Sequence, residues 1–205
     1  MTANTEFEIL TFESAAQWER WLARSHSVSS GVWLRFFKES SGVASVSHAE
    51  ALDAALCYGW IDGQIKKHDE ASWLRKFTPR RARSMWSKRN CEIVARLAEG
   101  GRMKPAGLKE VAEAKTDGRW HRAYDSPSKM TLPRDFLQAL AGHKKARAFM
   151  RTLNRANTYA IAWRLQTAKK PETRTKRMQA IIAMLAEGKR FHETPPPKRA
   201  RRPKE

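Results

Sequence analysis

The run Gly59-Trp60-Ile61-Asp62-Gly63 constrains the fold more than any other stretch of this chain. It holds a bulky aromatic residue and an acid between two glycines, which can adopt backbone conformations closed to other residues. The helix expected before it can end at Gly59 in the left-handed conformation. Two segments that read as strands follow, residues 60–67 and 72–77, around a polar turn at 68–70. We therefore expect an antiparallel hairpin here.

Helices and one more strand are expected around this hairpin. Capping boxes at Ser14–Gln17 and Ser47–Glu50 each predict the start of a helix. The aromatic and β-branched run at 31–38 predicts a strand of the same sheet. Ser84 is expected to cap a further helix that carries Val94 and Leu97 inward. Residues 1–115 are thus expected to form one α+β region around a small antiparallel sheet.

The remaining chain reads as helical. Residues 116–132 contain turn signals and are expected to form a connecting loop. Residues 133–191 show successive helical patterns with prolines at their starts, which predicts a helical bundle. Trp163 is expected to lie in its core. The basic residues and prolines of 192–205 predict a disordered tail. The fold class expected for the whole chain is α+β.

The charge of this chain is extreme and unevenly distributed. The formal net charge is +19, yet residues 1–70 hold 6 Lys and Arg against 10 Asp and Glu, a net of −4. The rest of the chain therefore carries +23. A field of this size attracts polyanions such as nucleic acid or anionic lipid. The alternative is a solubilising surface without a partner.

The hairpin suggests a candidate pocket. Asp62 could act as an acid or base, or it could pair with an arginine such as Arg75 or Arg80. The structural alternative, which we favour, makes Asp62 a buried ion-pair residue and Trp60 part of the core. One carboxylate is weak support for catalysis, so an enzyme is the less favoured alternative and no catalytic residue is predicted. The candidate pocket comprises Trp60, Asp62, Gly63, Phe77, Trp86 and Asn90.

A basic block interleaved with aromatic residues forms a second candidate site. Guanidinium groups bind phosphates in bidentate fashion, exposed aromatic rings stack on bases, and serines at a helix start can bind an anion. The alternative is that the aromatics pack the sheet and the arginines are solvated. The candidate anion-binding or nucleic-acid-binding residues are Arg75, Lys76, Arg80, Arg81, Arg83, Ser84, Ser87, Lys88 and Arg89.

Several classes of site and location lack support in the sequence. No paired histidine or cysteine spacing indicates a metal site, and no glycine-rich phosphate loop is present. We therefore expect neither a metal nor another cofactor. Cys57 and Cys91 are expected to be reduced thiols. No signal peptide or transmembrane segment is recognisable, so a cytoplasmic location is expected. The sequence does not predict an oligomeric state.

Two parts of the chain resemble the YdeI/OmpD-associated family, also described as bacteriocin-protection proteins. The first part is residues 56–90. The second comprises the run 132–136, the segments 146–149 and 159–163, and the closing segments 168–174 and 184–189. Together the resemblance spans residues 45–191. It implies a stress-tolerance role against cationic antimicrobial peptides or bacteriocins, with no defined activity and no catalytic residues. A nucleic-acid-binding protein that uses the block 73–90 and the tail remains one alternative. An enzyme acting on an anionic small molecule remains another.

Overall fold

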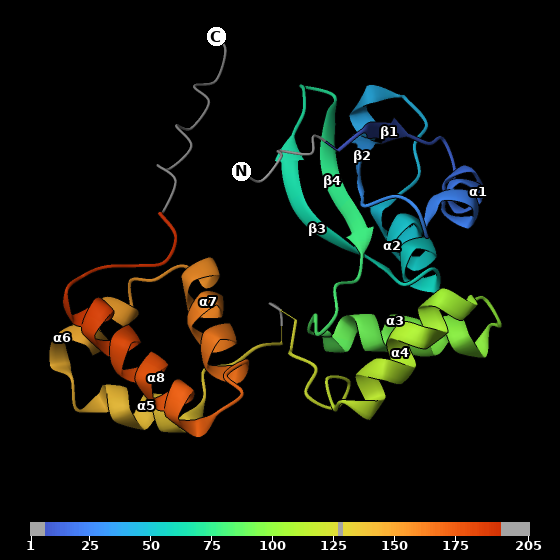
Figure 1. The fold of residues 1–205 in the computed structure, drawn as a ribbon. Helices are drawn as coiled ribbons and strands as arrows, with labels where there is room; N and C mark the ends of the chain where they lie inside the picture. The colour runs from blue at the N-terminus through green and yellow to red at the C-terminus, as the bar shows by residue number, and fades with distance from the viewer. Residues whose placement is uncertain (1–6, 127–128, 194–205) are drawn as a thin grey trace, which may run out of the picture. The chain divides into compact units, whose positions relative to one another are not determined.

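The computed structural model describes residues 7–126 and 129–193, and the chain divides into two compact units. The N-terminal unit is Met1–Ala123, and the C-terminal unit is Tyr124–Glu205. The expected α+β class is confirmed, because a four-stranded sheet and helices form the N-terminal unit, and the described elements of the other unit are helices (Figure 1). The expected disordered tail falls mainly on residues 194–205, which lie outside the described residues.

The sheet has the strand order β1-β2-β4-β3 and is built around the predicted hairpin. Strands β3 (Trp60–Lys67) and β4 (Ser72–Pro79) pair antiparallel, and β4 also pairs antiparallel with β2 (Val32–Phe37). One edge strand was not expected. Strand β1 (Ile9–Thr11) pairs parallel with β2 and makes the sheet mixed. Three residues are too short to give a periodic signal in the sequence.

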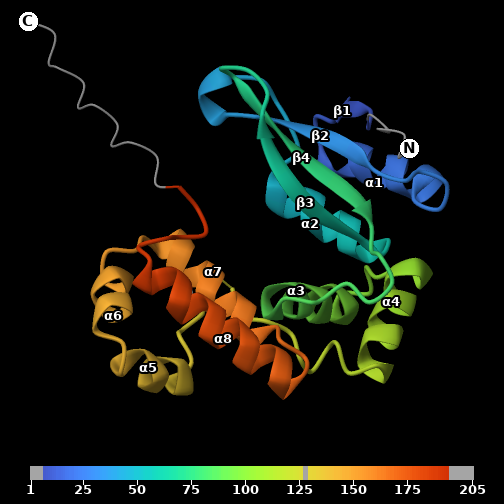
Figure 2. The ribbon, with the colours of Figure 1, turned by 60° about the vertical axis from the view of Figure 1, so that its left-hand side comes forward.

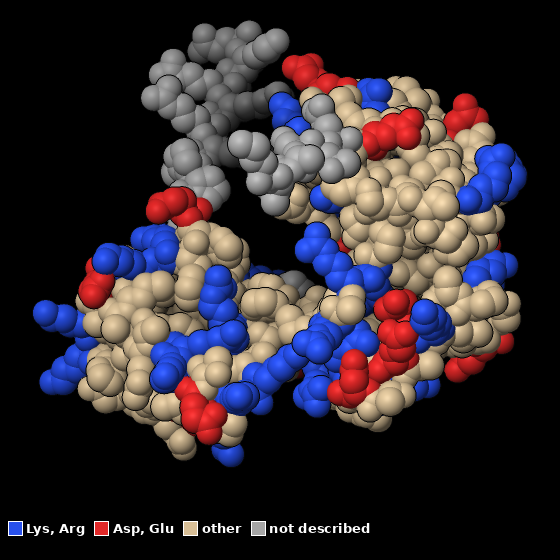
Figure 3. Space-filling view, in the orientation of Figure 1, with Lys and Arg blue, Asp and Glu red and all other residues tan. Residues whose placement is uncertain are grey.

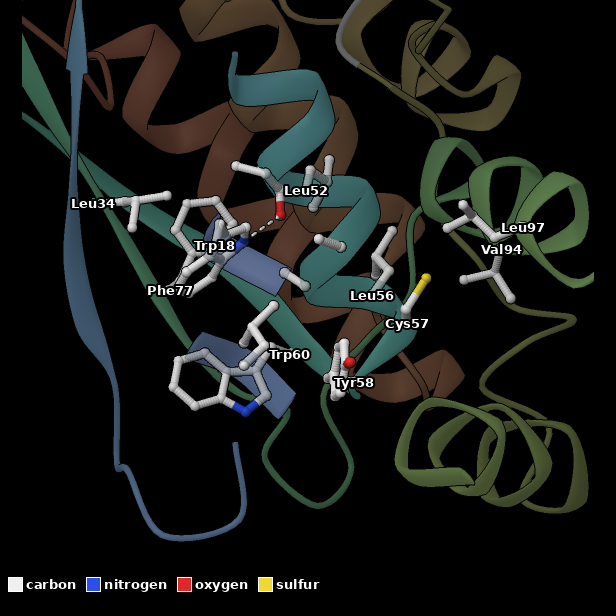
Figure 4. Packing of buried hydrophobic residues seen from close by; sticks show 14 of the residues in the cluster. Trp18, Leu34, Leu52, Leu56, Cys57, Tyr58, Trp60, Phe77, Val94 and Leu97 are labelled. Atoms are coloured by element: carbon white, nitrogen blue, oxygen red, sulfur yellow. Dashed lines mark hydrogen bonds between the residues drawn. The ribbon is translucent and has the colours of Figure 1, made fainter. Parts of the chain in front are cut away.

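One face of the sheet is covered by α1 (Ala15–Ser25) and α2 (His48–Cys57) (Figures 1 and 2). The Ser47–Glu50 capping box forms as predicted. The side chains of Trp18, Leu34 and Phe77 are completely buried between sheet and helices. The indole Nε1 of Trp18 donates to the carbonyl of Ala51 over 3.0 Å, which anchors α1 to α2 (Figure 4). The core of this unit therefore lies beneath β2 and β4.

Two further helices, α3 (Lys88–Glu99) and α4 (Pro105–Thr116), complete the N-terminal unit. The predicted cap of α3 is wrong by one turn. The hydroxyl of Ser87, not Ser84, accepts the amide of Asn90 over 3.1 Å and starts the helix. Helix α4 begins at Pro105, whose fixed φ suits the first helical turn, and its Gly107 lies against the end of α2. A Cβ atom on Gly107 would lie 2.3 Å from the carbonyl oxygen of Cys57, so only glycine allows this contact.

The C-terminal unit consists of α5 (Arg134–Ala141), α6 (Lys144–Met150), α7 (Arg155–Gln166) and α8 (Pro171–Ala186). Pro171 occupies the first turn of α8 as predicted. Apolar residues from all four helices form the core, namely Phe136, Leu140, Ala146, Ile161, Leu165, Ile181, Ile182 and Leu185. Trp163 is only half-buried. The expectation that it belongs to the core is wrong, because Ile161 and Leu165 turn inward and Trp163, two residues from each of them, points away from their face of the helix.

Candidate functional site: the hairpin and the basic surface

Within the Gly59–Gly63 run, Gly59 and Trp60 are packed into the fold, whereas Gly63 is not. Gly59 has φ +74°, and a Cβ there would lie 3.1 Å from the carbonyl oxygen of Ala106 in α4. Trp60 is 1% exposed, and its Nε1 donates to the carbonyl of His26 over 3.1 Å. In Figure 4 its ring lies in the cluster beneath α2. Gly63, by contrast, is exposed and has room for a side chain. The first part of the run is therefore a packing motif.

Asp62 pairs with Arg75, one of the two arginines expected as its partner. Its carboxylate accepts the Arg75 Nε over 3.0 Å and lies 3.0 Å from the Nε2 of His48, the first residue of α2. Burial by itself would raise the pKa of this carboxyl. The hydrogen bond from His48 and the charge and hydrogen bonds of Arg75 outweigh burial, so the pKa lies below its usual value. Asp62 therefore ties β3 to β4 and to α2.

A cavity of about 330 Å³ lies beside the hairpin and is lined by residues from both of its strands. Asp62 pairs across the strands with the buried Phe77, so both side chains lie on the helix-covered face. Lys76 and Thr78 flank Phe77 in β4 and therefore point to the opposite face. The residues that line the cavity are Ile61, Asp62, Gly63, Gln64, Lys76, Thr78, Pro79, Arg81 and Ser84.

The six residues of the predicted pocket do not converge on this cavity. Only Asp62 and Gly63 line it. Trp60, Phe77 and Trp86 are core residues with at most 1% of their surface exposed. Asn90 donates its backbone amide to the cap of α3. The arrangement expected of an enzyme, in which Asp62, an arginine and a tryptophan face one space, is therefore not formed by these residues.

The predicted anion-binding residues separate into internal and exposed groups. Arg75 is held by Asp62, and the Lys76 ammonium lies 3.8 Å from the centre of the Phe7 ring. Arg80 is 7% exposed, and its guanidinium lies 3.5 Å from the centre of the Trp86 ring. Such stacking on a buried ring holds a loop in place and leaves little of the side chain for a ligand. The exposed cations of the set are Arg81, Arg83, Lys88 and Arg89.

The loop that carries these exposed cations is fixed by a residue that the sequence analysis missed. Arg119 is 7% exposed, donates to the carbonyl of Ser84 over 3.0 Å, and pairs with Asp117 over 2.6 Å. Trp120 packs against Trp86, with ring centres 5.0 Å apart. Arg83 within this loop has φ +66°, an unusual conformation for a residue other than glycine. No local pattern links Arg119 to a loop 35 residues away, so its role could not be predicted from the sequence.

Most of the net positive charge belongs to the C-terminal unit. Residues 124–205 hold 20 Lys and Arg against 6 Asp and Glu, a net of +14, whereas residues 1–123 hold 20 against 15, a net of +5. On the face seen in Figure 3, basic side chains are spread widely over this unit and acidic ones are few. Arg174 is paired with Asp135. A polyanion would therefore find its strongest electrostatic attraction at this unit.

Neither a metal site nor a membrane-spanning helix is found among the described residues, 7–126 and 129–193. Among them, no group of three or more His, Cys, Asp or Glu side chains is placed to hold a metal ion. Within the same residues, no helix is both long and apolar enough to cross a membrane. Neither Cys57 nor Cys91 is therefore part of a metal-binding group within the described residues. Burial raises the pKa of the Cys91 thiol to about 11.

Comparison with family models gives two matches, and the two together span most of the described chain. Residues 10–110 match a domain of unknown function, DUF8412. The segment 56–90, which was expected to resemble the YdeI/OmpD-associated family, falls within this match. Comparison with curated proteins and with solved structures gave no match. Residues 129–188 match the model described as bacteriocin-protection, YdeI or OmpD-associated, so the expected resemblance to that family is confirmed for the C-terminal unit.

Proposed function

We propose that this chain is a cytoplasmic bacterial protein that contributes to tolerance of bacteriocins or cationic antimicrobial peptides, and that it acts by binding an anionic partner and not as an enzyme. One observation carries the proposal. The segment that matches the bacteriocin-protection model, residues 129–188, holds 13 Lys and Arg against 3 Asp and Glu. The part of the chain that is similar to a protective family thus carries a net charge of +10, about half of the total of +19.

The sign of this charge argues against direct capture of the toxic peptide. A cationic peptide and a protein of net charge +19 repel each other at the distances over which association begins. Protection therefore has to pass through a partner of opposite charge, such as a nucleic acid or another polyanion, or through an anionic surface inside the cell. Direct mixing of the protein with a cationic bacteriocin at low salt should show no binding, and tight, salt-sensitive binding would refute this argument.

Two charge-reversal variants locate the surface that matters. In the C-terminal unit, Lys144, Lys145 and Arg147 are exposed on α6 and can be changed together to Glu. In the N-terminal unit, Arg81→Glu, Arg83→Glu and Arg89→Glu change the net charge by the same amount at exposed positions. Cells that depend on the chain for survival under a cationic bacteriocin should lose protection with the first variant and keep it with the second. The reverse result would contradict the proposal.

A second candidate function is nucleic-acid binding through the block 73–90 and the tail. It is supported by the exposure of Arg81, Arg83, Lys88 and Arg89 around the start of α3. Because the aromatic residues Phe77 and Trp86 are buried, the expected contacts are with phosphates and not with stacked bases. Affinity for DNA or RNA should then fall steeply with salt. Removal of residues 195–205 and the reversal of Arg81, Arg83 and Arg89 should each reduce that salt dependence, and unchanged binding in both would exclude this site.

A further inference from the structure

A second cavity lies in the C-terminal unit, away from every residue singled out above as a candidate site. It has a volume of about 330 Å³, at the lower end of the range for small-molecule sites. Helices α7 and α8 pack side by side and provide most of its lining (Figures 1 and 2). The lining residues are Trp163, Arg164, Arg177, Ala180, Ile181 and Phe191. The walls are thus aromatic and aliphatic, with two guanidinium groups among them.

The wall formed by Phe191 is held in place by a buried asparagine. Asn157 lies in the first turn of α7 and is 1% exposed. Its Oδ1 accepts the backbone amides of Phe191 over 3.0 Å and of His192 over 2.9 Å, and its Nδ2 donates to the carbonyl of His192 over 3.0 Å. A buried amide with three such bonds fixes the segment after α8 against α7. The cavity is therefore built by the fold and not left by loose packing of an exposed end.

The two arginines of this cavity are oriented by neutral groups. Arg164 donates to the carbonyl of Ala160 over 3.0 Å, and its guanidinium lies 3.8 Å from the centre of the Phe191 ring. Arg177 donates to the carbonyl of Arg164 over 2.8 Å. Among the described residues, neither guanidinium forms an ion pair with a carboxylate, whereas Arg174 one turn earlier pairs with Asp135. Two fixed positive charges beside an apolar lining therefore remain uncompensated within the described part of the chain.

We propose that this cavity binds a small amphiphilic anion, a molecule with an aromatic or short aliphatic body and one carboxylate or phosphate group. The body would pack against Trp163, Phe191 and Ile181, and the anionic group would accept hydrogen bonds from Arg164 and Arg177. A guanidinium suits this role because its planar array of donors matches both carboxylate and phosphate oxygens. Both arginines are already positioned by backbone carbonyls, so binding requires little reordering of long side chains.

Titration calorimetry on the full chain in 150 mM salt tests the proposal with three probes: naphthyl phosphate, the uncharged naphthol, and inorganic phosphate. Naphthyl phosphate should bind one per chain with a Kd below about 1 mM. The other two should bind at least about tenfold more weakly, since each lacks one half of the recognised structure. Naphthol binding as tightly as naphthyl phosphate would overturn the proposal, as would the absence of any binding by naphthyl phosphate.

Three variants separate this cavity from the diffuse charge of the unit. Arg177→Ala should weaken naphthyl phosphate at least about tenfold. Lys176→Ala removes the same charge from an exposed neighbouring position of α8 and should change the Kd by less than about twofold. Ala180→Leu fills the cavity from an exposed helical position and removes no charge, so it should also weaken binding at least about tenfold.

Two results would refute the assignment. They are equal weakening by Lys176→Ala and Arg177→Ala, or unchanged binding in Ala180→Leu. Circular dichroism checks the fold of each variant. If Arg177→Ala fails to fold, the comparison of Ala180→Leu with the unaltered chain decides the question.

Discussion

Removal of the Asp62 carboxylate should destabilise the N-terminal unit by about 2 kcal/mol at pH 7. Only 13% of this side chain is exposed, and its partners Arg75 and His48 are each 25% exposed. Breaking a fully buried charge pair costs about 3–5 kcal/mol, whereas exposed pairs contribute less than about 1 kcal/mol. The substitution Asp62→Asn keeps the shape of the side chain and leaves Arg75 without its acidic partner. Its expected cost lies between these limits because a quarter of each partner still reaches water.

The pH dependence of the stability difference distinguishes the loss of an ion pair from a packing defect. The pKa of Asp62 is lowered in the folded chain, so its contribution is fully present above the ordinary carboxyl pKa of about 4. It is lost as the pH falls through the lowered folded-state pKa. The stability difference between the unaltered chain and Asp62→Asn should therefore be largest near neutrality and should shrink in acid.

Urea unfolding followed by tryptophan fluorescence is the appropriate assay. Seven of the eight tryptophans lie in residues 1–123, so the signal reports mainly the unit that contains Asp62. Asp53→Asn is the matched control, because Asp53 pairs with Arg96 and Arg102, which are 59% and 46% exposed. Its cost should stay below about 1 kcal/mol. A cost for Asp62→Asn no greater than that of Asp53→Asn, or one independent of pH, would refute the reasoning.

Three further predictions concern the packing of glycines, the reactivity of a cysteine and the hydrogen bonds of Asn157. Gly107→Ala should cost more than about 2 kcal/mol in urea unfolding, because the added Cβ would lie 2.3 Å from a backbone oxygen. Gly63→Ala, with its nearest contact at 3.7 Å, should cost less than about 1 kcal/mol. Cys91, with a pKa of about 11, should react with iodoacetamide at pH 8 at least about tenfold more slowly than a cysteine peptide, as measured by mass spectrometry. An equal rate would contradict the burial argument. Asn157→Ala should abolish the hydrogen-exchange protection of the amides of residues 191 and 192, whereas the neighbouring Thr158→Ala should leave it unchanged.

Features that depend on residues close in sequence could be predicted. The capping box at Ser47, the prolines at the starts of α4 and α8, and the β3–β4 hairpin all follow from local conformational preferences. Each satisfies its own backbone groups within a few residues, so no distant partner is needed to interpret it. The ion pair between Asp62 and Arg75 could also be anticipated, since the two residues lie on the paired strands of one hairpin.

Features set by distant contacts could not be predicted. Ser84 and Ser87 are equally good caps by residue type, and the cap falls at Ser87 because Trp86 is buried and Arg119 holds the preceding loop. The alternation of aromatic and basic residues at 73–90 fits an exposed binding surface and a packed core equally well. A guanidinium stacked on a buried ring, as Arg80 is on Trp86, produces the same sequence pattern. Asn157 gave no signal because a single helical asparagine has no periodic signature.

The total charge of the chain says little about where a partner would bind. In the N-terminal unit, Arg75, Arg80 and Arg119 are held within the fold by a carboxylate, a ring and a carbonyl. That unit also nearly balances its charge, with 20 basic and 15 acidic residues. The C-terminal unit has the same number of basic residues and only 6 acidic ones. At physiological salt, screening limits the range of the interaction between exposed charges to about 8 Å. An anionic partner therefore responds to this local excess of positive charge and not to the sum over the chain. The reversal of three charges on α6 should therefore weaken binding of a polyanion more than the equal reversal at Arg81, Arg83 and Arg89.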